Sequence, residues 1–177
     1  MKQKFLNPEE ILTDAGLQTG MTVADMGSGN GFFTIPAAQI VGDQGAVWAI
    51  DILEEALGQV ASSARLNKLK NIKTMQCDLD SMGSCKIPEL SCDFVIIGKV
   101  LPQMSKPETL VREAYRILKT GGKLVVVEWH KKSTPIGPPM EQRVGHKEAQ
   151  DIFAKQGFRY LGGAQPDGYH YALLFQK

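Results

Sequence analysis

The sequence is poor in cysteine, and its three thiol residues are Cys77, Cys85 and Cys92. The intervals between them match neither the C-x-x-C pairs of zinc sites nor an even-numbered disulfide framework. We therefore expect free thiols and no metal site. Free thiols are typical of a reducing compartment, so the cytoplasm is the expected location.

Long hydrophobic runs are also missing. No apolar run reaches the roughly 18 residues that a membrane-spanning helix needs, and Met1–Phe5 is not followed by the apolar stretch of a secretory signal. The chain has no basic tail and no arginine patch with interleaved aromatic residues. These absences argue against a membrane span and against a nucleic-acid partner.

The composition that remains is that of a soluble globular protein, with 43% hydrophobic and 22% charged residues. A length of 177 residues suits one domain with a single core. We therefore expect one domain over residues 1–177.

The most informative stretch is Val23–Thr34, an apolar run that ends in Asp25 and then crosses glycines at 27, 29 and 31. This pattern predicts a strand, a tight turn and a helix, with backbone open to close approach by another molecule. The dinucleotide fingerprint G-x-G-x-x-G would need a third glycine where Phe32 stands. The Gly-Lys-Ser/Thr ending of a P-loop is absent too, so no dedicated phosphate site is predicted.

Strand and helix patterns alternate along the rest of the chain. The strands read as continuous apolar runs, which indicates burial on both faces of a parallel sheet. Two further strands near the carboxyl end are close enough for a hairpin. The fold class is therefore α/β: a doubly wound, mostly parallel Rossmann-like sheet with an antiparallel C-terminal hairpin. The expected strands are 20–25, 46–51, 72–78, 92–98, 123–129, 158–161 and 169–175, and the expected helices are 8–16, 31–41, 53–69, 107–118 and 146–156.

Residues 131–145 follow the fifth strand and are rich in proline, which is incompatible with regular structure. Long loops at the carboxyl end of a parallel strand often cover a ligand site. We expect a lid loop here, with a plain connection as the alternative.

The succession of motifs resembles that of class I S-adenosylmethionine-dependent methyltransferases over almost the whole chain. The resemblance rests on the glycine turn, on Asp51 and Asp78 at the ends of the second and third strands, on Leu118–Lys123 before the fifth strand, and on the terminal hairpin. Within the class, the chain looks most like the small-molecule methyltransferases of the ubiquinone/menaquinone-biosynthesis type. Thr120 stands where that family usually has proline.

The resemblance implies S-adenosylmethionine as cofactor. The glycine turn would accept the methionyl part, Asp25 the ammonium, Asp51 the ribose diol and Asp78 the adenine amino group. Alternatives remain for each acid: Asp51 as a helix cap, Asp80 in place of Asp78, and a structural role for Asp25. The cofactor-binding residues expected are Asp25, Gly27, Ser28, Gly29, Gly31, Asp51, Ile52, Asp78, Leu79 and Gly98.

Methyl transfer from a sulfonium is an in-line displacement that depends chiefly on positioning. A base is required only when the acceptor must lose a proton. The catalytic candidates are Glu128 and His130 at the end of the fifth strand and Lys99 after the fourth, with His146 beyond the lid. Strand-end polar caps, and for Lys99 the positioning of a loop, are the competing interpretations.

We therefore predict a methyltransferase that moves a methyl group from S-adenosylmethionine to a small-molecule acceptor. The alternatives are a non-catalytic S-adenosylmethionine-binding module and an NAD-dependent dehydrogenase. Arsenite as acceptor is disfavoured, because it would need cysteines beside the methyl donor and Cys77 is expected inside a strand. The sequence does not identify the acceptor, and it is compatible with a homo-oligomer without determining the oligomeric state.

Overall fold

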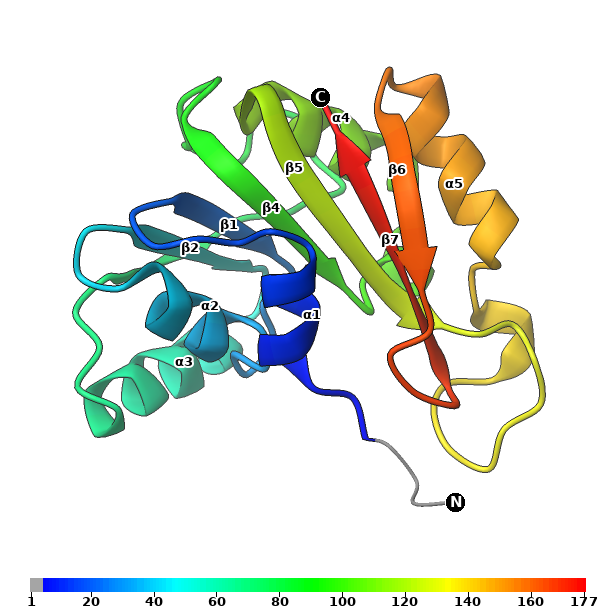
Figure 1. Cartoon of the computed structure of the whole chain (residues 1–177), viewed down its shortest axis with the longest axis horizontal. Coiled ribbons are helices and arrows are strands. Elements are labelled where there is room, and N and C mark those ends of the chain that lie inside the picture. Colours follow the sequence, from blue (N-terminus) through cyan, green and yellow to red (C-terminus); the bar gives the residue numbers. More distant parts are fainter. Residues whose placement is uncertain (1–4) are drawn as a thin grey trace.

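A seven-stranded sheet runs through the molecule in the order β3-β2-β1-β4-β5-β7-β6 (Figure 1). The structure is a computed structural model that describes residues 5–177. The strands are β1 (Thr22–Met26), β2 (Ala46–Asp51), β3 (Ile72–Gln76), β4 (Cys92–Gly98), β5 (Leu118–Trp129), β6 (Arg159–Ala164) and β7 (His170–Gln176). The helices are α1 (Pro8–Asp14), α2 (Thr34–Val41), α3 (Glu54–Leu66), α4 (Pro107–Ile117) and α5 (His146–Lys155), with the 3-10 turns η1 (Leu101–Gln103) and η2 (Met140–Gln142).

The first five strands pair in parallel, and β7 is antiparallel to both of its neighbours, β5 and β6. The predicted fold class is therefore confirmed. The chain order runs outward from β1 to β3 and then returns to the other side of β1 as β4. In open α/β sheets, ligands bind outside the carboxyl ends of the strands at such a switch point.

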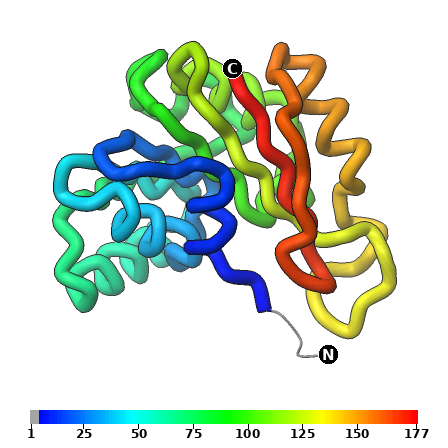
Figure 2. The backbone as a smooth tube through the Cα atoms, in the orientation of Figure 1, coloured from blue at the N-terminus to red at the C-terminus, as the bar shows by residue number. Residues whose placement is uncertain are grey.

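The central strands are buried on both faces because helices cover each side of the sheet. Phe94 and Ile96 of β4 pack into the cluster that contains α1 and α2, whereas Val95 and Ile97 pack toward α4 and α5. This alternation explains the continuous apolar run of that strand. The backbone trace in Figure 2 shows the loop after β5 and the turn between β6 and β7 at the same end of the molecule.

Several element boundaries differ from the sequence-based ones. The helix after the glycine turn begins at Thr34 instead of Gly31, because the N–H of Gly31 closes a turn on the carbonyl of Ser28. In the hairpin, Gly162 and Gly163 pair with β7 instead of forming the connection, and a register shift between Tyr160 and Gly162 accommodates them. The longer β6 places the turn at residues 165–169.

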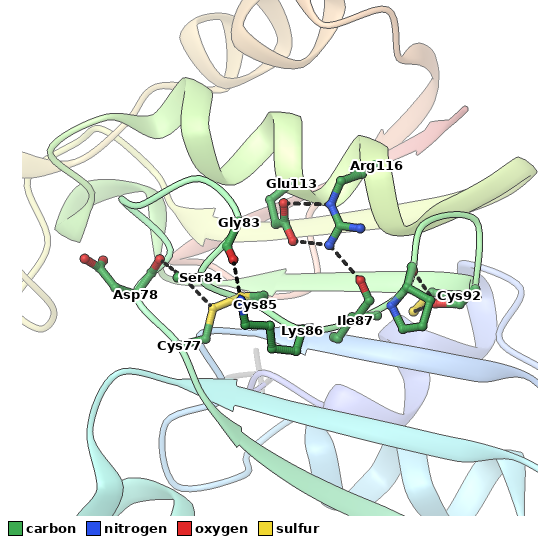
Figure 3. A network of polar contacts seen from close by, with 12 residues as sticks. Cys77, Asp78, Gly83, Ser84, Cys85, Lys86, Ile87, Cys92, Glu113 and Arg116 are labelled. Carbon is green, nitrogen blue, oxygen red and sulfur yellow. Dashed lines mark hydrogen bonds and ion pairs between the residues drawn. A yellow bond between two sulfur atoms is a disulfide. The ribbon is translucent and has the colours of Figure 1, made fainter.

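The expectation of three free thiols is wrong. Cys77 and Cys85 form a disulfide with a Cα–Cα distance of 5.3 Å, and only Cys92, which is buried, is free (Figure 3). Cys77 lies just beyond β3, which ends at Gln76, and not inside a strand as expected. The following loop turns back on itself and returns Cys85 to the end of β3. Sequence spacing alone does not reveal such a contact, because the path of the loop determines it.

Within residues 5–177, no helix has both the length and the apolar character needed to cross a membrane.

Candidate cofactor and acceptor site

A cavity of about 560 Å³ lies at the carboxyl ends of β1 to β4. It therefore occupies the switch point between β1 and β4, where the topology predicts a ligand. Its walls come from four segments that follow these strands: residues 27–33, 51–56, 77–80 and 98–104. The lining residues are Gly27, Ser28, Gly29, Asn30, Phe32, Phe33, Asp51, Ile52, Leu53, Ala56, Cys77, Asp78, Leu79, Asp80, Gly98, Lys99, Val100, Gln103 and Met104.

The glycines of the turn serve different purposes. A Cβ on Gly27 would lie 2.3 Å from a methyl group of Val100, so this position must remain glycine for packing. A Cβ on Gly29 would meet no atom within 4 Å, and Gly29 has a φ of +50°. Its backbone is therefore open to the cavity, as expected of a turn on which a ligand lies directly. Gly31, also predicted to bind cofactor, is not among the lining residues.

Asp51 contacts the backbone of two segments at the cavity wall. Its Oδ1 accepts a hydrogen bond of 3.0 Å from the N–H of Leu53, which is itself the N-cap residue of α3, so Asp51 is not the helix cap and its role toward a ribose stays a prediction. Its Oδ2 accepts a bond of 2.8 Å from the N–H of Gly29, and the residue lines the cavity. Carboxylate oxygens each accept more than one hydrogen bond, so the anion can still receive donors from a ligand.

The acids after β3 also divide their roles. Asp80 accepts hydrogen bonds from the N–H groups of Ser105 and Lys106, at 3.1 and 2.8 Å, and these donors hold the pKa of its carboxyl below the usual range. Asp80 thus ties one wall of the cavity to the other. Within residues 5–177, the carboxylate of Asp78 accepts one hydrogen bond, from the N–H of Asp80 to Oδ1 at 3.0 Å. Asp78 is therefore the better placed of the two for a ligand.

Asp25 lies beneath the cavity and does not line it. Only 1% of its surface is exposed, and its Oδ2 accepts a 2.6 Å bond from the hydroxyl of Thr34. Burial raises the pKa of this carboxyl to about 7. A direct role toward an ammonium group stays a prediction, and the observed contact is with the first residue of α2.

The donors and acceptors around the cavity fit an adenosine joined to an amino acid. The buried hydroxyl of Ser28 has no hydrogen-bond partner among residues 5–177, so a ligand carboxylate at the turn would satisfy it. Asp51 and Asp78 are acceptors for hydroxyl and amino groups. Ile52, which is 56% exposed, and Leu79 supply apolar surface between them.

The end of the cavity nearest β4 carries Lys99 and Phe32. The ammonium of Lys99 lies 4.7 Å from the centre of the Phe32 ring, which is 45% exposed. Lys99 has a φ of +60°, a left-handed conformation that is rare for residues with a side chain. Partial burial is the main cause that lowers the pKa of its amine. A desolvated cation beside an exposed ring is a suitable wall for an acceptor molecule.

Glu128 is fully buried and is not among the residues that line the cavity. Its Oε1 accepts a 2.9 Å bond from the N–H of Leu101, which fixes the segment that follows Lys99. Its Oε2 has no partner in the described part of the chain, and burial raises the pKa of the carboxyl to about 7. The observed contacts are those of a residue that positions the cavity wall.

His130 also lies outside the lining residues. Its backbone N–H donates to the carbonyl of Tyr169, and burial is the main cause that lowers the pKa of its imidazole. His146 packs edge-on against the ring of Tyr171, with 5.4 Å between the ring centres. The structure thus brings Lys99 to the cavity, while Glu128, His130 and His146 lie behind it.

The segment 131–145 is organised by Arg143, which is buried. Within the described chain Arg143 forms no ion pair with the nearby Glu141, and its guanidinium instead donates to four backbone carbonyls. These belong to His130, Lys132, Ile136 and Pro138. No residue of this segment lines the cavity, so its role as a lid stays a prediction.

No pattern in the sequence indicates the pair that Asp167 and His170 form at the β6–β7 turn. The carboxylate of Asp167 lies 2.8 Å from Nδ1 of His170, and both side chains are nearly buried. Asp167 also accepts the N–H groups of Tyr169 and His170. Residues 165–169 have the composition of an ordinary turn, and only the folded arrangement shows that the charge of Asp167, like that of Glu128, acts on the pKa of Lys99.

A second cavity of about 330 Å³ lies between α1 and the β6–β7 hairpin and shares no lining residue with the first. It lacks the glycine turn and the strand-end acids, so the cavity at the switch point is the candidate site.

Comparisons with known proteins identify the family and the fold. A family described as a methyltransferase domain matches residues 17–157. The chain is similar to the ubiquinone/menaquinone biosynthesis C-methyltransferase UbiE of Citrobacter koseri and of Enterobacter sp. (strain 638), with 28% identity over 159 residues. These alignments cover 83% of this chain but 60% of each relative, so the chain spans less than two thirds of their length.

Among solved structures, an S-adenosylmethionine-dependent methyltransferase from Aquifex aeolicus has a TM-score of 0.90 and 27% identity, covering 97% of this chain and 90% of that one. The [4+2]-cyclase SpnF has the same fold, with a TM-score of 0.80, 17% identity, and coverage of 96% of this chain and 80% of that one.

Proposed function

The chain belongs to the family of S-adenosylmethionine-dependent methyltransferases, and on that premise we propose that it transfers a methyl group from S-adenosylmethionine to a small-molecule acceptor. The observation that carries the proposal is the pairing of the open backbone at Gly29 with the carboxylate of Asp51, on the wall of one cavity. A turn that accepts a ligand on its backbone and an acid for a ribose diol are the two parts of a nucleoside site.

In this proposal the turn at residues 27–29 and the hydroxyl of Ser28 receive the carboxylate of the cofactor. Asp51 accepts hydrogen bonds from the ribose, Asp78 accepts one from the adenine amino group, and Ile52 and Leu79 pack against the base. The cofactor supplies an activated methyl group. The protein needs only to hold the acceptor in line with it and to exclude water.

The acceptor would enter at the end of the cavity that carries Lys99 and Phe32. Phe32 offers an exposed flat ring, and Lys99 offers a cation whose position is fixed by its strained backbone and by the bond from its N–H to the carbonyl of Val127 at 2.8 Å. Glu128 holds the next segment through Leu101. If the acceptor must lose a proton, Lys99 is the candidate base that already lies on the cavity wall.

The names of the curated relatives make a carbon atom of a quinol-type molecule the first acceptor to test. Because the chain covers only part of those relatives, their substrates are transferred to it only as a proposal. We likewise propose a cytoplasmic location and no nucleic-acid partner, and we leave the oligomeric state to measurement.

A non-catalytic S-adenosylmethionine-binding module is the alternative, and one observation favours keeping it. The [4+2]-cyclase SpnF shares the fold, so the fold by itself does not specify methyl transfer. An NAD-dependent dehydrogenase is disfavoured by Phe32 in the place of the third glycine.

Isothermal titration with S-adenosylmethionine, its demethylated product S-adenosylhomocysteine, and NAD separates these readings. We expect both sulfur compounds to bind and NAD not to bind. Transfer of a labelled methyl group is then measured on a panel of quinols, phenols, amines and thiols. Binding without transfer to any of them would favour the module, and binding of NAD alone would refute the proposal.

A further inference from the structure

The disulfide lies at the wall of the cofactor cavity. Cys77 lines the cavity, and its N–H donates to the carbonyl of Asp51 at 3.0 Å. Its sulfur is bonded to Cys85 eight residues later, and both side chains are buried. The bridge is therefore attached to the carboxyl end of β2 at one side and closes a short loop at the other (Figure 3).

The closed loop carries the residues that we assign to the adenine end of the cofactor. Asp78, Leu79 and Asp80 lie between the two cysteines, and all three line the cavity. The hydroxyl of Ser84 donates a 2.5 Å bond to the carbonyl of Asp78 and lies 3.1 Å from the sulfur of Cys77. Asp80 in turn accepts N–H groups from the opposite wall at residues 105 and 106. The position of this loop thus sets the shape of that end of the cavity.

Beyond Cys85 the chain is anchored independently of the bridge. The guanidinium of Arg116 donates a 2.7 Å bond to the carbonyl of Ile87 and is itself held by two bonds to Glu113 on the same helix (Figure 3). Between the cysteines, by contrast, residues 81–83 are exposed. Opening of the bridge therefore removes the covalent restraint on residues 78–84, which then rely on the bonds between Asp80 and the opposite wall, and leaves the chain after Ile87 in place.

We propose that Cys77 and Cys85 form a reversible redox modification site that controls the affinity for the cofactor, an inference that rests on the proposed function. In the oxidised state the bridge holds the adenine wall in the binding arrangement. In the reduced state residues 78–84 sample other arrangements, and the cofactor must order them when it binds.

The co-reactant is a low-molecular-weight thiol–disulfide couple such as glutathione. Oxidation forms the Cys77–Cys85 S–S bond, breaks the S–S bond of one oxidised glutathione, and releases two glutathione thiols that carry the two protons and two electrons. Reduction is the reverse reaction and consumes two thiols. Cys92 takes no part, because it is fully buried and burial raises the pKa of its thiol to about 11.

The size of the effect follows from the fraction of molecules with an ordered wall. If reduction lowers that fraction to about a tenth, the apparent dissociation constant rises about tenfold. Linkage is reciprocal, so saturation with cofactor must lower the equilibrium constant for reduction of the bridge by the same factor of about ten.

The test measures S-adenosylhomocysteine affinity by isothermal titration on the full chain, first with oxidised glutathione and then with an excess of a phosphine reductant. Alkylation of denatured protein followed by mass spectrometry counts the free thiols in each sample. We expect one labelled cysteine and tight binding in the oxidised sample. We expect three labelled cysteines and about tenfold weaker binding after reduction, and recovery on reoxidation.

Two variants separate the bridge from other effects of the reductant. The double variant C77S/C85S should bind weakly in both conditions, whereas C92S should respond as the unsubstituted chain does. Amide hydrogen exchange of residues 78–84 should rise on reduction and fall again when S-adenosylhomocysteine binds. This second measurement needs no substitution and so does not depend on how the variants fold.

Equal affinity in the two redox states would overturn the inference and leave the proposed function standing. The inference would also be overturned if the affinity of C77S/C85S still changed with the redox state, or if the oxidised sample showed three labelled thiols. Absence of S-adenosylhomocysteine binding in both states would instead overturn the proposed function, and the inference with it.

Discussion

Oδ2 of Asp51 accepts a hydrogen bond of 2.8 Å from the backbone N–H of Gly29. This bond joins the turn after β1 to the carboxyl end of β2. The second oxygen of the same carboxylate accepts a hydrogen bond from the N–H of Leu53. One acidic side chain thus fixes two walls of the cavity before any ligand is present. Preorganisation of this kind reduces the ordering that a ligand must bring about when it binds.

Substitution of Asp51 by alanine should therefore have two separable effects. Loss of the two bonds from the N–H groups of Gly29 and Leu53 should lower the free energy of unfolding by about 1 to 2 kcal/mol. Loss of a charged acceptor for the ribose should weaken binding of S-adenosylhomocysteine on the order of 100-fold. Thermal unfolding without ligand and isothermal titration measure the two effects on the same protein.

Asp51→Asn is the matched variant, since it retains one carbonyl acceptor and removes the charge. We expect it to keep only one of the two backbone hydrogen bonds, because its amide nitrogen cannot accept one. Its stability should therefore lie between those of Asp51→Ala and the unsubstituted chain, and it should bind the ligand poorly. Asp14→Asn, on the exposed last residue of α1, is the control for loss of an acid elsewhere. If Asp51→Asn binds with unchanged affinity, the ribose assignment is wrong.

The two glycines of the turn provide a second contrast. Gly27→Ala brings a Cβ to 2.3 Å from Val100 at a φ of +82°, so we expect a loss of about 2 to 4 kcal/mol in stability. Gly29→Ala meets no neighbouring atom, so its stability loss should stay near the roughly 1 kcal/mol of a left-handed alanine, while its new methyl group obstructs the ligand.

Denaturant unfolding and titration with S-adenosylhomocysteine distinguish the two glycine variants. In the double variant G27A/V100A the clash is relieved, and part of the stability should return. A Gly29→Ala variant with unaltered affinity would show that the ligand does not lie on this backbone.

The alternation of helices and strands could be predicted from the sequence because it depends on the hydrophobic periodicity of neighbouring residues. The apolar runs at 46–51 and 92–98 coincide with β2 and β4, since residues on both faces of these strands are buried. The boundaries failed where tertiary contacts decide them. Gly162 looks like a turn residue, and it lies in β6 because pairing with β7 continues through a register shift.

The candidate site was predictable to the extent that it lies at strand ends. Asp51, Asp78 and the glycine turn follow directly from the order of the strands, and the structure brings them to one cavity. The Cys77–Cys85 bridge and the Asp167–His170 pair depend on how loops fold back, which no local pattern encodes. Glu128 was predicted as a catalytic candidate because it lies at a strand end, and the structure buries it outside the lining of the cavity.

Glu128 makes the stability dependent on pH. In the unfolded chain its carboxyl has the ordinary value of 4.5, and burial raises the folded pKa to about 7. Between these values the folded state binds more protons than the unfolded state, so the free energy of unfolding falls as pH rises. The difference between the unfolded and folded pKa values corresponds to a loss of about 3 kcal/mol in the free energy of unfolding by pH 8.

Glu128→Gln should remove the part of the pH dependence that comes from Glu128, because the amide carbonyl keeps the bond from Leu101 and cannot ionise. The measurement is urea unfolding from pH 5 to pH 8 for both proteins. Asp25, whose pKa burial also raises to about 7, contributes a slope of the same sign in both. Identical slopes for the two proteins would mean that Glu128 is not protonated in the folded state.

The segment 131–145 is ordered through one side chain, and this makes its proposed role as a lid testable. Arg143 donates to four carbonyls, and its guanidinium lies 5.4 Å from the ring centre of Trp129. A lysine ammonium carries the same charge, but it lacks the planar fork that reaches several carbonyls at once. Arg143→Lys should therefore lower stability by about 2 kcal/mol and raise amide exchange over residues 130–140.

If the segment covers the acceptor, Arg143→Lys should leave the affinity for S-adenosylhomocysteine unchanged, because the segment does not line the cofactor cavity. It should slow methyl transfer and raise solvent hydrolysis of the cofactor, because a disordered cover no longer excludes water from the reacting centre. Arg159→Lys, on the exposed edge strand β6, controls for the loss of a guanidinium. An unchanged transfer rate in the presence of raised amide exchange would identify the segment as a connection between β5 and α5 and not as a lid.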